Sequence, residues 1–211
     1  MIWIVEVYHS PECSQIANKM FLVREQNDHI VLSGLFKSEE RILVLRYVGL
    51  RASVTVQAVA DATGRSKGFV SQYLNMLVDE ELLTRDHRAF IREDSVYWRS
   101  IKRLLNLDLL RPHVTLPAWA EGIGIYGSWA EGTNTTESDL DVWILVSRYD
   151  PDLEIRAAEL DQEIAQYAGC EVNSLLLTPD KLCHLKEHDQ PFYTSLKRGF
   201  LTLHGEDLEF A

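Results

Sequence analysis

Residues 122–146 read GIGIYGSWAEGTNTTESDLDVWILV, and this stretch decides how the C-terminal half of the chain is interpreted. An apolar run ends in Gly127-Ser128, and a second apolar run opens with Asp139 and Asp141 after a loop of roughly ten residues. Side chains at i and i+2 of a strand point to the same face, so the two aspartates are expected side by side, about 7 Å apart along the strand. The stretch therefore predicts a strand, a Gly-Ser turn, a loop, and a second strand that begins with two carboxylates.

Two neighbouring carboxylates repel each other unless a cation lies between them. Mg²⁺ suits this position because it prefers carboxylate oxygens and keeps coordination positions open for phosphate. Glycine lets the backbone approach a phosphate closely, and the N-terminus of a following helix offers N–H groups to an anion. The residues thus predict metal ligands at Asp139 and Asp141 and phosphate contacts at Gly127 and Ser128.

This pattern resembles the DNA polymerase β-type nucleotidyltransferase superfamily, and within it the minimal nucleotidyltransferases, over roughly the last 95 residues. Gly132 and Ser138 also fit the family pattern and join Gly127 and Ser128 as expected nucleotide-binding residues. The resemblance implies that the aspartates hold Mg²⁺ in a two-metal site. It also implies that the substrate is an NTP, ATP in the first instance, and that AMP passes to an acceptor as pyrophosphate leaves.

A third carboxylate usually completes the family's site from a later strand, where it acts as the base or as a ligand of the second metal. Glu171 is the candidate in this chain, and Asn173 follows two residues later on the same face of the expected strand. If the family's acid corresponds to Glu171, the catalytic set is complete. If it corresponds to Asn173, the general base is missing, because an amide cannot take a proton. The sequence leaves both alternatives open.

Two further residues bear on this loop. Minimal nucleotidyltransferases often carry an arginine where this chain has Glu131, and a carboxylate near triphosphate oxygens weakens binding unless it points away or is paired. Trp129 could stack on a base, but an aromatic residue beside a strand more often belongs to the core, and the core is the favoured position.

Charge is distributed unevenly over the 211 residues, whose net charge is −11. Residues 38–112 hold twelve basic and ten acidic side chains, whereas residues 113–211 hold six basic and eighteen acidic ones. A step of this size indicates two modules with different partners. No apolar run approaches the ~18 residues that cross a membrane, so no membrane partner is expected. Three scattered cysteines favour a reducing cytoplasm over a disulfide framework.

Residues 38–112 show the pattern of a helical module. A helix is expected from Ser38, a short one ends at Gly64, a longer one is capped by Ser66, and two extended pieces flank Asp86-His87. This order resembles a winged helix-turn-helix, and a connecting helix is expected over 95–110. The resemblance implies duplex-DNA contacts from the third helix and the wing. The candidate residues are Arg65, Ser66, Lys67, Ser71, Gln72, Asn75, Arg85 and Arg88.

The chain is therefore predicted to be of mixed α/β (α+β) class, with a winged helix-turn-helix and a nucleotidyltransferase-fold mixed sheet flanked by helices. The expected segments are an extension with a strand and a helix (1–37), the winged helix with its connecting helix (38–112), and the nucleotidyltransferase domain (113–211). Beyond 146, helices are expected from Asp150-Pro151 to Gly169, from Thr178-Pro179, and from Phe192 to Gly199, with strands over 170–177 and 200–205.

Two functions follow from these expectations. The first is a Mg²⁺-dependent transferase that moves AMP to a hydroxyl of a protein or small molecule, with an attached DNA-binding module. The second is a DNA-binding regulator whose transferase-like domain binds a nucleotide or a partner without turnover. Minimal nucleotidyltransferases often neutralise a separate toxin protein, so an antitoxin role is an expectation from the family resemblance. A homodimer is expected by analogy with winged-helix proteins that read paired half-sites.

Overall fold

The computed structural model describes residues 36–208. The strand and helix expected within residues 1–37 lie almost wholly outside that range. Ser38–Ala211 group as one unit, apart from Met1–Lys37, and every contact below lies within the described part of that unit. None of the helices in 36–208 combines the length and the apolar character needed to span a bilayer.

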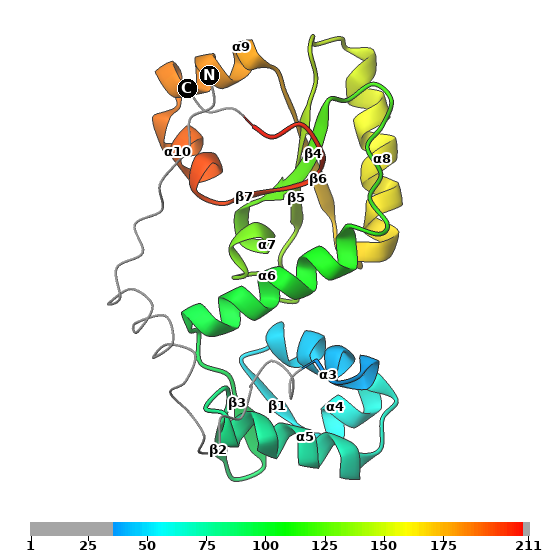
Figure 1. Cartoon of the computed structure of the whole chain (residues 1–211), viewed down its shortest axis with the longest axis vertical. Coiled ribbons are helices and arrows are strands. Elements are labelled where there is room, and N and C mark those ends of the chain that lie inside the picture. The colour runs from blue at the N-terminus through cyan, green and yellow to red at the C-terminus, as the bar shows by residue number, and fades with distance from the viewer. Residues whose placement is uncertain (1–35, 209–211) are drawn as a thin grey trace, which may run out of the picture. The chain divides into compact units, whose positions relative to one another are not determined.

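The first half of this unit contains three helices and a small antiparallel sheet (Figure 1). The elements are α3 (Glu39–Gly49), β1 (Ser53–Thr55), α4 (Val56–Thr63), α5 (Lys67–Asp79), β2 (Thr84–Asp86) and β3 (Ala89–Ile91). The Ser66 hydroxyl accepts the N–H of Phe69 at the start of α5, and Gly64 ends α4 in the left-handed conformation. These boundaries match the predicted helix–turn–helix and hairpin.

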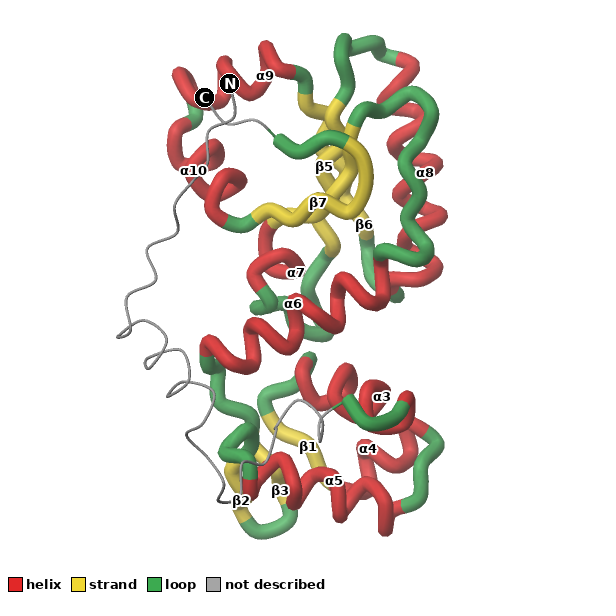
Figure 2. The backbone as a smooth tube through the Cα atoms, viewed as in Figure 1, coloured by secondary structure: helices red, strands yellow, loops and turns green. Residues whose placement is uncertain are grey.

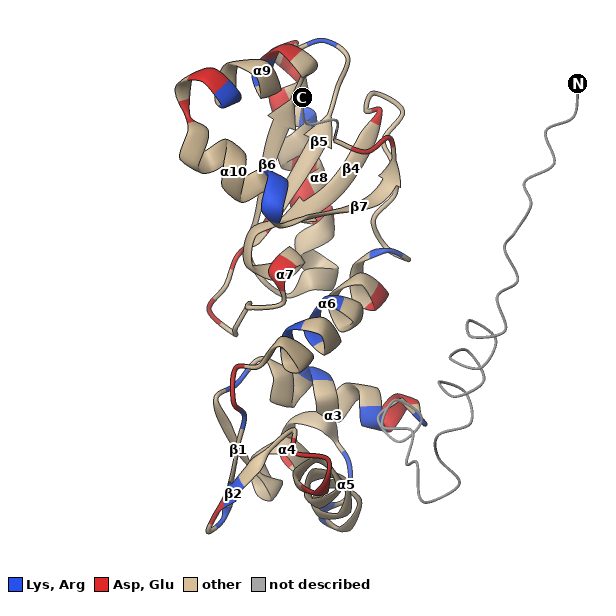
Figure 3. Ribbon diagram, turned by 60° about the vertical axis from the view of Figure 1, so that its left-hand side comes forward, with Lys and Arg blue, Asp and Glu red and all other residues tan. Residues whose placement is uncertain are grey.

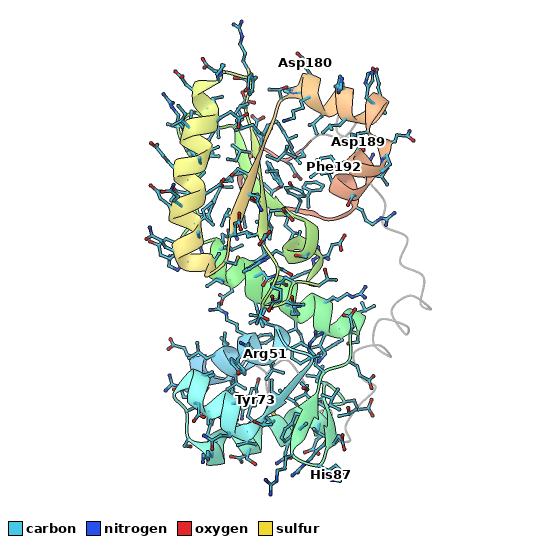
Figure 4. The ribbon with its side chains drawn as sticks, turned by 180° about the vertical axis from the view of Figure 1, so that it is seen from behind. Arg51, Tyr73, His87, Asp180, Asp189 and Phe192 are labelled. Atoms are coloured by element: carbon cyan, nitrogen blue, oxygen red, sulfur yellow. The ribbon has the colours of Figure 1, made fainter. Side chains whose placement is uncertain are left out.

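Strand β1 was not predicted, and it completes the small sheet. It lies between α3 and α4 and pairs with β3, so the strand order is β1-β3-β2. Three residues are too few to show the alternation by which strands are recognised. The hairpin between β2 and β3 has His87 at its tip with a positive φ, and Figure 4 shows this residue at the end of the module.

Helix α6 (Val96–Leu110) follows, as expected for the connecting helix. The Ser95 hydroxyl caps it by accepting the N–H of Trp98. The Trp98 ring is buried, and its indole N–H donates to the carbonyl of Leu82 at 2.5 Å. The side chain of Arg46 on α3 forms an ion pair with Asp108 of α6 at 2.7 Å, so α6 contacts the first three-helix group directly.

The second half of the unit is built on a four-stranded mixed sheet (Figure 2). Its elements are β4 (Gly122–Tyr126), α7 (Gly127–Glu131), β5 (Leu140–Leu145), α8 (Asp152–Ala168), β6 (Val172–Leu177), α9 (Pro179–His188), α10 (Gln190–Arg198) and β7 (Phe200–Gly205). The strand order is β6-β5-β4-β7; β5 and β6 are parallel, and the other pairs are antiparallel. The predicted fold class, a mixed sheet flanked by helices, is confirmed.

Helices cover both faces of this sheet (Figure 1). Along β5, Val142 and Ile144 pack in the cluster that includes the buried residues of α8, whereas Trp143 and Leu145 pack with residues of α9 and α10. Because side chains alternate along a strand, the odd-numbered residue Asp141 shares the face of Trp143. The sheet thus directs Asp141 toward the face covered by α9 and α10.

Candidate active site

The Gly-Ser turn ends β4 in a conformation that requires glycine. Gly127 has φ +64°, and a β-carbon built there would lie 2.6 Å from Oδ2 of Asp141. The preceding residue, Tyr126, pairs with Asp141 across the antiparallel β4–β5 ladder. The absence of a side chain at position 127 therefore leaves room for the carboxylate of Asp141 directly against the turn.

Asp139 immediately precedes β5 and is exposed, and Asp141 is the second residue of β5 and is half-buried. Burial raises the pKa of the Asp141 carboxyl, and the charge of Asp139 raises it further. Burial also raises the pKa of Tyr126 to about 12, with a smaller contribution from Asp141. These shifts report mutual repulsion and incomplete hydration of the carboxylates, which a bound divalent cation would relieve. The donors present thus fit a hard metal ion such as Mg²⁺.

The neighbouring strand β6 decides what stands beside the aspartates. Asn173 pairs in register with Asp141 in the parallel β5–β6 ladder, so these side chains project from the same face. Glu171 precedes β6, is exposed, and accepts the N–H of Leu140 through its backbone carbonyl at 2.9 Å. Within residues 36–208, no three His, Cys, Asp or Glu side chains come together as a metal site. The structure joins the two aspartates and places an amide, not Glu171, directly beside Asp141.

The other predicted nucleotide-binding residues, Ser128, Gly132 and Ser138, differ in their distance from the turn and in their contacts. Ser128 is half-buried in α7, one residue after the turn. Gly132 ends α7 with φ +73°, and a β-carbon there would lie 2.1 Å from the Arg99 carbonyl oxygen of α6. The hydroxyl of Ser138 accepts the N–H of Thr135 at 2.9 Å and so orders the loop before β5. Gly132 and Ser138 therefore have evident structural roles, and Gly127 and Ser128 remain next to the aspartates.

Trp129 lies on the opposite side of the sheet from Asp141, whereas Glu131 lines a surface hollow together with residues of α10. Glu131 is exposed and lies against Gly199, in a surface hollow that Arg99, Arg103 and Arg198 also line. Of these arginines, Arg99 interacts electrostatically with Glu131, but its ion pair is with Asp94. Trp129 is buried in the core cluster that packs on α8, as the favoured reading of the sequence expected.

The face of the aspartates is closed by α10. The ring of Phe192 meets Tyr126 edge to face, with ring centroids 6.2 Å apart, and Figure 4 shows Phe192 on the inner side of α10, toward the sheet. Tyr126 is also the cross-strand neighbour of Asp141, so this aromatic pair lies beside that carboxylate. Partial burial of Asp141 strengthens its electrostatic interactions.

The predicted DNA-contacting residues lie on α5, at its N-terminal end and in the hairpin. Arg65, Ser66, Lys67, Gln72, Arg85 and Arg88 are exposed, and Ser71 and Asn75 are half-buried. The guanidinium of Arg85 donates to Oδ1 of Asn75 at 3.2 Å and lies over the Phe90 ring at 5.5 Å. Ser66 is engaged as the N-cap of α5. The hairpin is thereby joined to α5, and the two elements present one polar surface.

The sequence offered no sign of a buried polar cluster formed by Lys102, Asn106 and Asn134. Lys102 and Asn106 lie within the predicted connecting helix over 95–110, and Asn134 lies in the predicted loop before the second strand. All three are at least 93% buried, with exposed fractions of 3%, 7% and 0%. One sequence feature points to their burial. Lys102 and Asn106 are four residues apart and directly follow the apolar residues Ile101 and Leu105, so all four lie on one side of α6.

Comparison with known families finds one match: the family model described as "Nucleotidyltransferase domain" covers residues 117–193. This range contains the turn, both aspartates and β6. Residues 117–193 are thus a nucleotidyltransferase domain. A search of curated proteins finds no significant match to the chain.

Solved structures resemble the chain only weakly. NolR from Sinorhizobium fredii is 23% identical, with 50% of this chain and 94% of that chain covered and a TM-score of 0.31. A toxin–antitoxin structure with AMP-PNP is 21% identical, covering 50% and 73%, with a TM-score of 0.31. The toxin–antitoxin MntA–HepT is 18% identical, covering 51% and 73%, with a TM-score of 0.28. Likenesses at this level carry no argument about function.

Proposed function

We propose, from the nucleotidyltransferase domain at residues 117–193, that the C-terminal module (113–211) binds an NTP with Mg²⁺ and transfers a nucleoside monophosphate, AMP from ATP, to a hydroxyl group. The observation that carries the proposal is the close approach of the Asp141 carboxylate to Gly127, with the charge of Asp139 near enough to act on Asp141. The turn brings backbone N–H groups to the place where two carboxylates can hold a cation, and phosphate requires both.

Each residue has a defined task in this proposal. Asp139 and Asp141 hold the metal, which when bound neutralises charge on the triphosphate and orients it for in-line displacement. Gly127 and Ser128 contact the outer phosphates through N–H and hydroxyl groups. Glu171 takes the proton of the acceptor hydroxyl. Phe192 and Tyr126 form the aromatic pair beside the Asp141 carboxylate.

The negative charge of the C-terminal module favours one class of substrate as the acceptor of the nucleoside monophosphate. Residues 113–211 carry eighteen acidic and six basic side chains, so a polynucleotide would meet like charge over most of this module. A neutral or cationic small molecule, or a protein side chain in a neutral or cationic environment, is not repelled in this way. We therefore propose a protein or small-molecule hydroxyl as acceptor. Efficient extension of an oligonucleotide primer by the purified protein would contradict this choice.

The register of β6 favours a second candidate function. If Asn173 stands where the family has its third acid, the module binds Mg²⁺ and nucleotide as a regulator without turnover. The two candidates share the aspartate site and differ only in whether a proton acceptor is present. Radiolabelled ATP with Mg²⁺ separates them: transfer of label supports the enzyme, and binding without transfer supports the regulator.

Substitution of the two β6 candidates gives the sharper test. Glu171→Gln is expected to lower the transfer rate by about 100-fold or more and to spare Mg·ATP affinity, because it removes a general base without touching the metal ligands. Asn173→Asp is the matched variant on the same face of the sheet. Full activity of Glu171→Gln overturns the base assignment. Transfer that appears only in Asn173→Asp assigns the wild type to the regulator class.

We further propose that residues 38–112 bind duplex DNA as a winged helix-turn-helix, with α5 in the major groove and the β2–β3 hairpin beside it. Exposed Arg65 and Lys67 at the start of α5, and Arg85 and Arg88 in the hairpin, supply cations for phosphates. The ordered contact between Arg85 and Asn75 supports the proposal because it joins the two elements into one surface.

Arg65→Ala combined with Lys67→Ala is expected to weaken DNA binding and to reduce the slope of log K against log salt by about 1.8, since two fewer phosphates are neutralised. Fluorescence anisotropy over a salt series measures both quantities. Arg148→Ala with Arg156→Ala removes the same charge from exposed positions of the C-terminal module and serves as the control. If the salt slope of DNA binding is unchanged in the α5 variant, α5 does not contact DNA phosphates, and residues 38–112 have a purely structural role.

A further inference from the structure

A cavity of about 200 Å³ lies where α3, α6, the loop before β5 and the end of α8 meet. Helices α3 and α6 lie against each other here, and Figure 3 shows basic residues along α6 beside α3. Gly49 of α3 makes room for the stem of Lys102, whose Cγ would lie 3.3 Å from a β-carbon at that position. Trp129 and Leu109 on its wall belong to the core on the α8 side of the sheet, whereas Ser138 and Cys170 bring the opposite wall close to Asp139.

The polar groups of this wall are mainly donors. The ammonium of Lys102 donates to the backbone carbonyl of Asn134, and Nδ2 of Asn106 donates to Oδ1 of Asn134 at 3.1 Å and to the Trp129 carbonyl at 2.8 Å. These bonds occupy both oxygen atoms of Asn134, its backbone carbonyl and its side-chain Oδ1. Nδ2 of Asn134, on a residue with no exposed surface, has no hydrogen-bond partner, and neither has Nε of Arg46. Buried donors without acceptors are costly, so the cavity favours an occupant that accepts hydrogen bonds.

The wall of the cavity also carries the cations Arg46 and Lys102, of which Arg46 is ion-paired with Asp108. Lys102 is 3% exposed, and no carboxylate among residues 36–208 lies within ion-pair distance of its ammonium. Asp94 influences Lys102 only from a distance and is itself bound to Arg99 at 2.5 Å. Burial and the charge of Arg92 lower the pKa of Lys102 to about 8, so the ammonium stays mostly charged at neutral pH. A buried cation of this kind normally has an anionic partner.

The rest of the wall is apolar, and the volume limits the size of an occupant. Leu50, Leu105, Leu109 and Ala168 line the cavity together with the Trp129 ring. An engineered protein cavity of about 150 Å³ holds benzene, so the space of about 200 Å³ here suits an aromatic ring with a small substituent. The complementary ligand has an apolar body and one oxyanion end.

We propose that this cavity is a binding site for a small organic oxyanion, a phosphate monoester or a carboxylate with an apolar body. The oxyanion accepts from Lys102, Asn134 and Arg46, and the body fills the space between Leu105 and Trp129. The site does not depend on the function proposed for the aspartates. An occupant would contact Ser138, the residue before Asp139, and so lies one residue from the metal-binding pair.

Calorimetry on the full chain tests the site with phenyl phosphate, benzoate and phenol, in EDTA so that the aspartates hold no metal. At least one oxyanion is expected to bind one to one with Kd about 0.1–1 mM, and neutral phenol at least about tenfold more weakly. The two oxyanion arms distinguish a phosphate ligand from a carboxylate ligand. Absence of binding of both oxyanions at 10 mM, or equal binding of phenol, overturns the proposal and leaves a cavity filled by water.

Variants on neighbouring positions of α6 locate the binding. Lys102→Met keeps the aliphatic stem and removes the charge, and it is expected to weaken oxyanion binding about tenfold or more. Arg103→Met removes a charge from the adjacent, exposed position and is expected to leave the affinity unchanged. Equal affinity of Lys102→Met and wild type overturns the assignment.

A measurement on the wild type avoids any dependence on the folding of Lys102→Met. Titration with the bound oxyanion is expected to shift the side-chain amide NMR signals of Asn106 and Asn134. Shifts confined to the backbone signals of Gly127 and Ser128 would place the ligand at the nucleotide site and refute the cavity.

Discussion

Asp139→Asn combined with Asp141→Asn is expected to abolish Mg²⁺-dependent ATP binding, with a loss of affinity of about 100-fold or more and an intact fold. The charge of Asp139 acts on Asp141, and among residues 36–208 no third His, Cys, Asp or Glu joins them as a metal site. An amide oxygen carries no net charge, so two substitutions remove the whole anionic contribution to metal binding. Titration calorimetry with Mg·ATP measures the loss.

The same double variant has a predictable stability without metal. The pKa of Asp141 is raised in the folded protein by burial and by Asp139. A raised carboxyl pKa means that the folded state is favoured below the unfolded pKa and loses that advantage as pH rises through the folded pKa. At neutral pH the ionised pair therefore opposes folding. Its removal is expected to raise Tm by about 1–2 °C, which is the effect of a typical surface substitution on stability. The rise should vanish when the pH is lowered below the pKa of free aspartate.

Glu154→Gln with Glu159→Gln is the control for the aspartate variant, since both residues are exposed on α8 and the change in charge is the same. It is expected to keep wild-type Mg·ATP affinity. Unchanged affinity in the aspartate variant itself would remove the basis of the proposed function, whatever the control shows.

Gly127→Ala is the second large effect expected. The new β-carbon would lie 2.6 Å from Oδ2 of Asp141, so the turn or the carboxylate must move. Gly127 also has φ +64°, a conformation that costs a residue with a side chain roughly 1–2 kcal/mol. We expect a loss of stability of about that size and a loss of Mg·ATP affinity of about tenfold or more.

Gly64→Ala separates the two causes. Gly64 has nearly the same φ, +67°, and a β-carbon there meets no atom within 4 Å. This variant is expected to lose similar stability, measured by thermal unfolding, and to keep full Mg·ATP affinity. If Gly127→Ala and Gly64→Ala bind Mg·ATP equally well, the close approach of the turn to Asp141 has no role in binding the nucleotide.

Local features of the chain were predictable because they depend on neighbouring residues. The cap at Ser66 and the stop at Gly64 follow from short-range hydrogen bonding and backbone freedom. The alternation that puts Asp141 and Trp143 on one face of β5 follows from strand geometry. Strand β1 escaped prediction because its partner β3 is distant in sequence and its own three residues carry no pattern.

The sequence by itself thus determined the mixed α/β class, the order of the long elements, and the carboxylate pair behind a Gly-Ser turn. Only the tertiary structure decided which residue of β6 stands beside Asp141, because strand register depends on how whole strands pack and not on the spacing of Glu171 and Asn173. It likewise turned Lys102 from a basic helix residue into a buried cation facing Asn134. Burial of a residue depends on segments that are distant in sequence and pack against it. The sequence of α6 alone therefore does not show that α3 and the loop before β5 cover Lys102.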